Sequence, residues 1–350
     1  MAHDTGYPQL LVTLFHELLN TFIHSAGDYP LLSQVHQIWH KEPDRTNNLL
    51  VLVPIGFGLI ASFLIRYVIG HVLMSMLIVE ISVKQTGSET SDSGQSKPAP
   101  PSRYLLQAIG GLYSKGGVKL FLNGIGSACT YWMMHSSTTG LLHKLVSIPG
   151  PIADILATVL LAEYRFFWTA RTILPRHQQH FVLSSRDYQR LKALVPATAV
   201  YAIIESFMMD FPALFHRDFA LSASTEVTKA SLLGIVRSDI LVSGVMLAAQ
   251  LLLFFPALIA LTLVQVSLLP STCETLISAP ANQRRQQQQQ RGSRIGEIFA
   301  VFNRVPLKVQ DAAKIIEAKH VLWCLELHGK MCVCLFGVSA VVHLAVYNMK

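Results

Sequence analysis

The sequence predicts an all-α integral membrane protein whose six transmembrane helices form three helix pairs. Three observations predict this class. Hydrophobic residues make up 51% of the 350-residue chain and charged residues 14%, whereas charged residues make up about 25% of a typical soluble domain. Six apolar segments are long enough to cross a bilayer, and the loops between them alternate between rich and poor in Lys and Arg. The mean hydropathy of +0.41 agrees with a chain that exposes much of its surface to lipid.

The six apolar segments each cover the roughly 20 residues that a helix needs to cross the hydrocarbon core of a bilayer. They lie near residues 49–80, 118–146, 151–174, 194–217, 235–269 and 319–348. Several exceed the minimum length, which predicts tilted or kinked helices. Pro54, Pro212 and Pro256 supply kink points, because neighbouring helices can satisfy the backbone groups that a proline frees.

The lengths and charges of the loops group these segments into the pairs 49–146, 151–217 and 235–348. A long loop lies inside each pair, at 81–117, 175–193 and 270–318, and the links between pairs are shorter. These three loops hold 15 Lys and Arg residues, whereas the opposite side holds four, namely Lys41, Arg45, Lys229 and Lys350. This bias places all three loops on one face of the membrane and both termini on the other.

Outside the spans, residues 1–48 form a separate N-terminal region, and residues 49–350 form the membrane bundle. Apolar residues recur at helical spacing over 8–24, interrupted by His16 and Glu17, which predicts an amphipathic helix on the membrane surface. The polar stretches 85–102 and 282–293 are low in complexity and predict disordered spacers. Each spacer precedes an expected surface helix, at 103–115 and at 294–318, the second of which Pro306 must break.

Composition and motifs also indicate what the chain is not. The net charge of +7 fits basic loops that face anionic lipid, and no nucleic-acid-reading motif accompanies it, so we expect no nucleic-acid partner. We expect no enzyme, cofactor or metal, because the chain lacks a phosphate-binding glycine loop, a zinc motif and a nucleophile elbow. The five cysteines show no CxxC pair, and we expect buried free thiols.

One stretch gives a family resemblance: residues 112–124 (LYSKGGVKLFLNG) place an aromatic and a basic residue before a glycine, and then an aromatic residue and a glycine at the start of the next helix. This stretch and the three-pair layout resemble the mitochondrial carrier family, which has three repeats of a kinked helix, a surface helix and a second helix. On this resemblance, Gly70, Ala162 and Pro256 are equivalent kink points, 92 and 94 residues apart.

The charged signatures of that family are largely missing here. The segment around Pro256 keeps the proline without its charges, and the segment holding Glu163 and Arg165 keeps charges without the proline. Family members with eroded signatures include outer-membrane homologues that act in membrane-protein insertion, lipid scrambling or fusion. The resemblance therefore implies a mitochondrial membrane protein, with the outer membrane favoured over the inner. It implies insertion, scrambling or mitochondrial membrane organisation as its function, with the bilayer, lipid headgroups or client membrane proteins as partners.

Two other readings remain open at this point. One is a mitochondrial solute transporter, whose partner is a small solute, and the other is a structural subunit of a membrane complex. Ionisable residues at membrane depth are costly and usually face a cavity or a partner. We therefore expect a polar groove lined by these candidates: Arg66, His71, Glu163, Arg165, Arg171, Glu205, Asp210, Glu326 and Lys330. The alternative is that several of them lie near helix ends and extend their charges to the interface.

Overall fold

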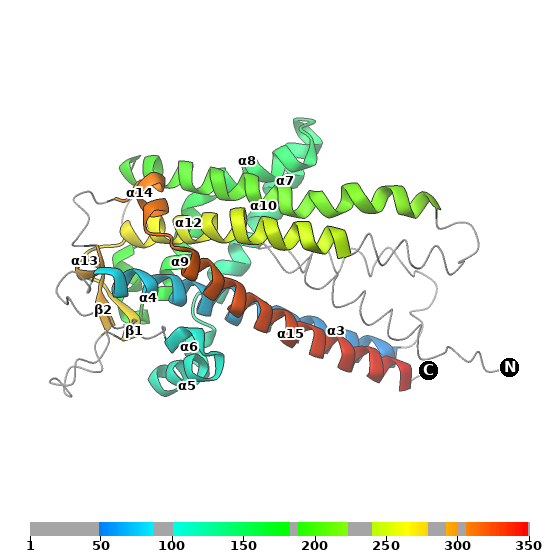
Figure 1. Ribbon diagram of the computed structural model, residues 1–350, viewed down its shortest axis with the longest axis horizontal. Coiled ribbons are helices and arrows are strands. Elements are labelled where there is room, and N and C mark those ends of the chain that lie inside the picture. The colour runs from blue at the N-terminus through cyan, green and yellow to red at the C-terminus, as the bar shows by residue number, and fades with distance from the viewer. Residues whose placement is uncertain are drawn as a thin grey trace. The chain divides into compact units, whose positions relative to one another are not determined.

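The computed structural model describes residues 49–86, 101–182, 188–222, 240–278, 292–299 and 306–348. About 87% of these residues lie in helices (Figure 1). Within the described residues, four helices are long and apolar enough to cross a membrane: Gly56–Ser82, Tyr188–Phe211, Ile240–Ser267 and Ala318–Val342. The described chain therefore fits a mainly helical integral membrane protein. The expected N-terminal amphipathic helix at 8–24 lies outside the described residues.

The chain divides into two compact units, which we describe separately. Unit 1 comprises residues 1–66, 205–252 and 328–350, and unit 2 comprises residues 67–204 and 253–327. Each of the four candidate spans contributes residues to both units.

Two of the candidate spans contain a π-helical turn. The first runs through α3 (Leu49–Ile65), the π-helix η1 (Arg66–Leu73) and α4 (Met74–Thr86). Another runs through helical residues 240–249, the π-helix η4 (Gln250–Phe254) and α12 (Phe255–Ser267). Wide turns of this kind accommodate a glycine or a proline that weakens the regular ladder of hydrogen bonds. Gly70 lies inside η1, and Pro256 is the second residue of α12, two residues after the end of η4.

Segment 151–174 is not one continuous helix. It forms α8 (Gly150–Leu160) and α9 (Ala162–Ile173), which meet at the non-helical residue Leu161. Local helix irregularities thus occur at or beside Gly70, Ala162 and Pro256, the three kink points that are equivalent on the carrier resemblance. Of the two helices, α8 is apolar but too short to span a bilayer alone, and α9 carries Glu163, Arg165 and Arg171.

Segment 118–146 begins later than its apolar residues indicated. The helix expected at 103–115 is present as α5 (Leu105–Gly116), preceded by the short η2 (Pro101–Arg103). The chain then forms the one-turn α6 (Val118–Phe121) before α7 (Ile125–Leu145) starts. Although 21 residues long, α7 is not among the four candidate spans, because a run of polar residues from His135 to Thr139 lowers its hydropathy. The sequence predicts six spans, whereas four of the described helices have the length and composition of a span.

Segments 194–217 and 319–348 are long helices. They form α10 (Tyr188–Ser222) and α15 (Ala318–Asn348), and the short η3 (Arg176–Val182) precedes α10. Within unit 2, α12 packs against α4, α9 and α14 (Val309–Lys314), while α7 packs against α8 and α9.

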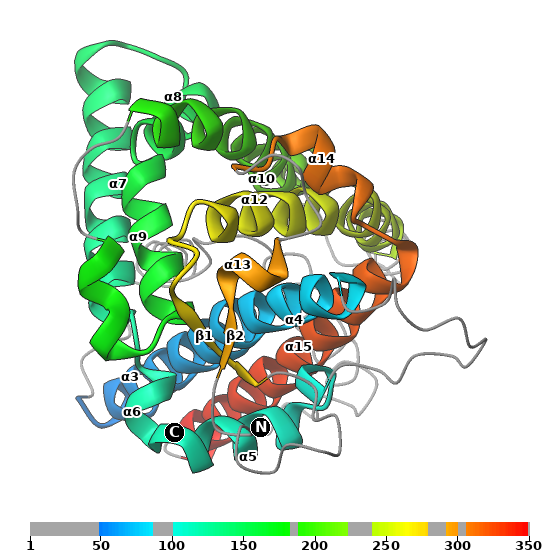
Figure 2. The same cartoon turned by 90° about the vertical axis from the view of Figure 1, so that its left-hand side faces the viewer.

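The loop after α12 differs from the sequence-based prediction in two ways. Strands β1 (Glu274–Ser278) and β2 (Gly292–Arg294) pair antiparallel, so the described chain is not entirely helical. The expected helix over 294–318 is instead β2, the one-turn α13 (Ile295–Ile298) and α14. Strand β1 contains the run Thr275 to Ile277, whose β-branched members favour a strand. This strand contacts α4 (Figure 2), and Lys115 Nζ donates a 2.8 Å hydrogen bond to the Leu276 carbonyl.

Ionic and polar contacts link the loop of the first pair to two helices of unit 2. The backbone N–H of Ser102 donates to Glu80 Oε2 at 3.1 Å, and Arg103 Nε lies 2.5 Å from Glu326 Oε2. Partial desolvation lowers the pKa of Lys115, and the nearby Glu80 carboxylate opposes that shift. These contacts fix the start of the surface helix against α4 and α15.

Candidate intramembrane polar sites

Unit 1 buries several polar side chains on helices that are otherwise apolar. Two of them, Arg66 and Glu205, are predicted groove residues, and Glu205 is only 2% exposed. Four other buried polar residues of unit 1 were not predicted from the sequence, namely Ser206, Ser243, Gln250 and His328. Arg66 is close enough to His328 and Cys332 to interact electrostatically with both. Unit 1 therefore holds a set of buried polar groups contributed by four separate stretches of chain.

Gln250 is the most informative member of this set. Its side chain is fully buried, and neither its amide nitrogen nor its amide oxygen has a hydrogen-bond partner among the described residues. Ser243 precedes it by seven residues, two helical turns, so both lie on one face of the helix. The Ser243 hydroxyl also has no hydrogen-bond partner within the described ranges. A desolvated amide of this kind costs about 1–3 kcal/mol unless something polar reaches it.

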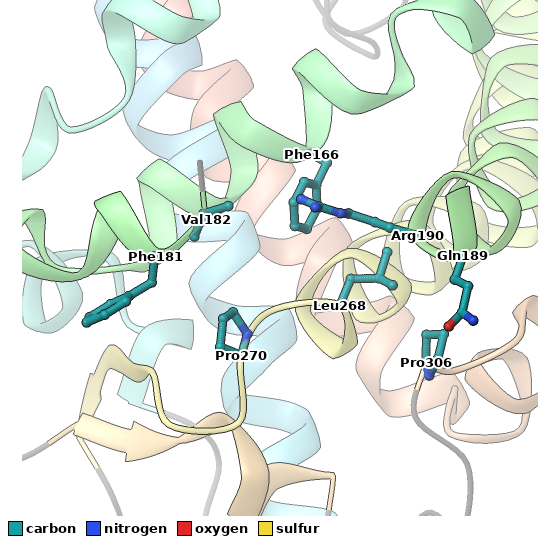
Figure 3. Close-up of a pocket in the computed structure, with 8 residues that line it drawn as sticks. All are labelled: Phe166, Phe181, Val182, Gln189, Arg190, Leu268, Pro270 and Pro306. Carbon is teal, nitrogen blue, oxygen red and sulfur yellow. The ribbon is translucent and has the colours of Figure 1, made fainter. Parts of the chain in front are cut away.

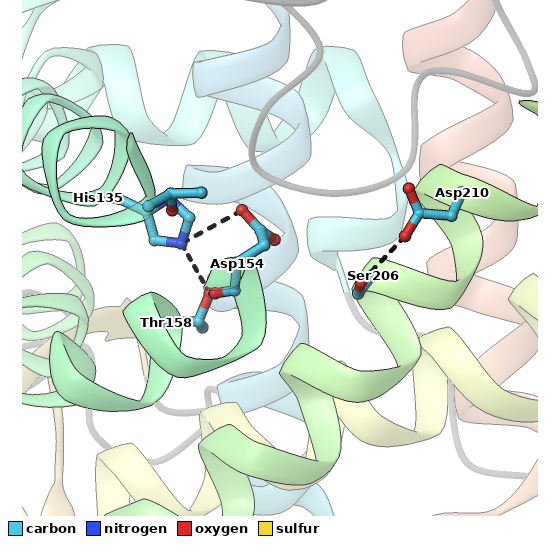
Figure 4. A network of polar contacts seen from close by, with 6 residues as sticks. His135, Asp154, Thr158, Ser206 and Asp210 are labelled. Carbon is cyan, nitrogen blue, oxygen red and sulfur yellow. Dashed lines mark hydrogen bonds and ion pairs between the residues drawn. The ribbon is translucent and has the colours of Figure 1, made fainter. Parts of the chain in front are cut away.

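The two remaining candidates in unit 1 are more exposed. Asp210 accepts a 3.3 Å hydrogen bond from Ser206 Oγ, one turn earlier on α10 (Figure 4). Lys330 lies partly exposed on α15. Asp210 thus lies beside the buried Ser206 rather than being buried itself.

Unit 2 contains an aromatic and basic cluster that includes two predicted groove residues. The His71 ring stacks on Trp168, with centroids 3.8 Å apart, and Trp168 in turn contacts Tyr131 at 5.6 Å. Arg165 is only 3% exposed, and its guanidinium carbon lies 4.0 Å from the centroid of the Tyr201 ring. Such a cation–π contact helps to hold a charge away from water. The structure therefore brings α9, α10 and the first span together around buried polar rings.

A second polar contact in unit 2 joins α7 to α8. His135 Nε2 lies 2.9 Å from Thr158 Oγ1 and 3.7 Å from Asp154 Oδ1 (Figure 4). Thr158 also donates to the Asp154 carbonyl at 3.0 Å. His135 is almost fully buried, whereas a third of the Asp154 side chain is exposed. His135 belongs to the polar run that lowers the hydropathy of α7, and its imidazole fixes α8 against that helix.

The other predicted groove residues in unit 2 serve local contacts. Arg171 Nη1 donates to Ser127 Oγ at 2.5 Å, which joins α9 to α7. Glu163 occupies the first turn of α9, where a carboxylate stabilises the positive end of the helix dipole. Glu326 accepts the hydrogen bond of Arg103 described above. Of the nine candidates, unit 1 thus holds Arg66, Glu205, Asp210 and Lys330, and unit 2 holds the rest.

The junction between α6 and α7 is held by a single buried amide. Asn123 Nδ2 donates to the carbonyls of Arg171 at 2.5 Å and Leu174 at 3.1 Å, which end α9. Its Oδ1 accepts a 3.0 Å hydrogen bond from Gln179 Nε2, and its backbone carbonyl accepts one from the Tyr67 hydroxyl. Asn123 thereby satisfies carbonyls that the end of a helix leaves without intrahelical partners.

The cysteines are free thiols, but not all are buried as expected. Cys273, Cys324 and Cys332 are buried, Cys334 is partly exposed, and Cys129 is exposed on α7. Burial raises the pKa of the Cys273 thiol, which disfavours its reactive thiolate. Within the described ranges, no group of three or more His, Cys, Asp or Glu side chains could hold a metal ion.

Comparison of the chain with known protein families, with curated proteins and with solved structures found no match.

Proposed function

We propose that this chain is a divergent, carrier-type integral membrane protein of a mitochondrial membrane, the outer being favoured, that provides a passive polar path through hydrocarbon. The path serves polar groups that otherwise cross a bilayer at high cost, namely phospholipid headgroups and the polar parts of inserting helices. Its action requires no chemical step, because it lowers the free energy of placing a polar group at membrane depth.

The observation that carries this proposal is the buried amide of Gln250 together with the Ser243 hydroxyl on the same helix face. Both lie in a candidate span, where lipid offers no hydrogen bonds. Because a buried polar group without a partner costs free energy, packing alone gives no reason for these two side chains. Their presence on one face, with Glu205 and Arg66 buried in the same unit, supports a face that solvates polar groups in transit.

The carrier-type assignment rests on the layout of the chain. The first pair has the expected order of kinked span, surface helix and second helix, in α4, α5 and α7. Helix irregularities beside Gly70, Ala162 and Pro256 agree with the even spacing that the sequence suggests. A repeat of about 93 residues with a bend at one equivalent point is the pattern that the carrier resemblance implies.

The test is reconstitution of the full chain into phosphatidylcholine liposomes that carry a trace of a fluorescent phospholipid. We expect a membrane-impermeant reductant to quench the label in both leaflets, because headgroups exchange between them. Gln250→Leu should slow exchange roughly tenfold, since losing one polar partner costs about 1–3 kcal/mol at the barrier. The same variant should unfold at an equal or higher temperature, because it removes a buried amide without partners among the described residues.

Gln310→Leu is the matched control, since it makes the same exchange at an exposed position in α14. It should leave the exchange rate unchanged. Equal rates in the wild type and in Gln250→Leu would show that this face is not the path.

A parallel assay should follow insertion of a helix with a polar tail into the same liposomes. Liposomes that show neither exchange nor insertion would refute the proposal. Saturable uptake of one compound, with thermal stabilisation by it, would instead favour a solute transporter.

A further inference from the structure

A cavity of about 270 Å³ lies in unit 2, where several loops and helix ends meet. Residues from α9, η3, the first turn of α10, the end of α12 and the loop before α14 surround it. They are Phe166, Phe181, Val182, Gln189, Arg190, Leu268, Pro270 and Pro306. A cavity needs only about 10–15 Å³ of such space to hold one water, so this one has room for a much larger group. The cavity therefore accommodates a headgroup and the start of an apolar chain, but not a whole lipid.

The described lining combines one positive charge, one amide and six apolar side chains. Arg190 is the charged residue among the eight, and Gln189 contributes an amide. Arg190 reaches from α10 toward Phe166 (Figure 3), and its guanidinium lies 5.4 Å from the centroid of that ring. The other six side chains are apolar. A guanidinium has five N–H donors in a planar fork, so it can bind a phosphate with two of them while keeping its existing contacts.

The position of the cavity along the chain indicates where its occupant comes from. Gln189 and Arg190 stand at the start of the candidate span Tyr188–Phe211. Leu268 and Pro270 follow directly after the candidate span Ile240–Ser267. Ends of spans lie at the depth of lipid headgroups. The loops at these ends belong to the side of the chain that is rich in Lys and Arg.

We propose that this cavity binds the headgroup of a phospholipid with a terminal phosphate, with Arg190 gripping the phosphate and Phe181 and Leu268 contacting the glycerol and upper acyl chain. Among the described residues that line the cavity, none is acidic and could pair with an ammonium group. The site therefore selects phosphatidic acid over the zwitterionic phosphatidylcholine. This lipid site is separate from the polar face around Gln250 and does not depend on the function proposed for that face.

The experiment measures thermal stabilisation of the full chain, purified in a neutral detergent, by added phosphatidic acid, phosphatidylcholine or inorganic phosphate. A ligand that binds the folded state raises the melting temperature, and at a fixed concentration a tighter ligand raises it more. We expect phosphatidic acid to stabilise the wild type and the other two to have little effect. Arg190→Gln should weaken phosphatidic acid binding roughly tenfold, as the loss of a charge-assisted pair does.

Lys192→Gln is the control, because it removes the same charge from an exposed residue in the same turn of α10. It should bind phosphatidic acid like the wild type. Arg190→Lys keeps the charge but loses the planar fork, so it should bind several-fold more weakly, and it carries the test if Arg190→Gln does not fold. Equal stabilisation by phosphatidylcholine or by inorganic phosphate would overturn the proposal, as would unchanged binding in both Arg190 variants. Because headgroup exchange is measured in phosphatidylcholine alone, either proposal can fail while the other stands.

Discussion

Gly124→Ala should lower the free energy of unfolding by about 2–4 kcal/mol, the largest loss that we expect from any single methyl group added to this chain. Gly124 precedes α7 with a φ of +84°, in the left-handed region that residues with a side chain avoid. A Cβ placed there would lie 2.9 Å from Thr172 Oγ1 and 3.2 Å from the Tyr67 hydroxyl oxygen. Backbone strain and steric overlap therefore add at one position.

The matched control for this prediction is Gly126→Ala. Gly126 lies two residues further on, inside α7, and apart from its chain neighbours and the nearby helix backbone no atom lies within 4 Å of the position that its Cβ would occupy. Because alanine favours a helix interior over glycine, this variant should be unchanged or more stable by about 0.5–1 kcal/mol. Reversible unfolding in mixed micelles, followed by far-UV circular dichroism, measures both. Equal destabilisation of the two variants would show that the turn at Gly124 is not formed as described.

Asn123→Ala should cost about 2–3 kcal/mol, because it deprives buried backbone carbonyls of a donor. The side chain is only 4% exposed and bonds to the carbonyls of Arg171 and Leu174 at the end of α9. Gln179 Nε2 reaches the same two carbonyls at 3.1 and 3.3 Å as well as Asn123 Oδ1. The same unfolding experiment measures the loss.

A double-mutant cycle distinguishes this network from two independent contacts. Since Asn123 and Gln179 share partners, the effects of Asn123→Ala and Gln179→Ala should not add, with a coupling of about 0.5–3 kcal/mol. Ser137→Ala is the control, because the exposed Ser137 hydroxyl bonds only within its own helix, to Met133 O at 2.8 Å. Strict additivity of the two amide substitutions would contradict the shared network.

The helices were largely predictable from the sequence, because long apolar runs leave few alternatives to a helix at membrane depth. The surface helix before Gly116 was predictable from its place between a polar spacer and a glycine pair. The break at Leu161 lies beside Ala162, which the carrier resemblance alone marked as a kink point, because no proline stands there. The strand pair β1 and β2 was also missed, since its two short strands are separated by a long polar stretch and neither shows a clear alternation.

The candidate site was only half predictable, for a physical reason. Charged residues such as Arg66 and Glu205 stand out in an apolar segment because their burial is costly. Gln250 and Ser243 do not, since lone amides and hydroxyls are common in membrane helices and often bond to a neighbouring helix. Their seven-residue spacing was the one available signal. Neither Gln250 nor Ser243 has a hydrogen-bond partner among the described residues. This depends on where the other helices lie, which the sequence alone does not give.

The number of spans is the most direct test of the three-pair bundle. With six spans, the link at 146–150 between α7 and α8 lies on the face of the termini. With four spans, it lies on the same face as residues 87–100. Ser147 is exposed in this link, so Ser147→Cys and Ser93→Cys, each in a chain whose native cysteines are serine, report the two positions. In sealed vesicles that hold the protein in one orientation, an impermeant maleimide should label the two variants from opposite sides of the membrane. Labelling from the same side would reduce the bundle to four spans and contradict the carrier-type fold.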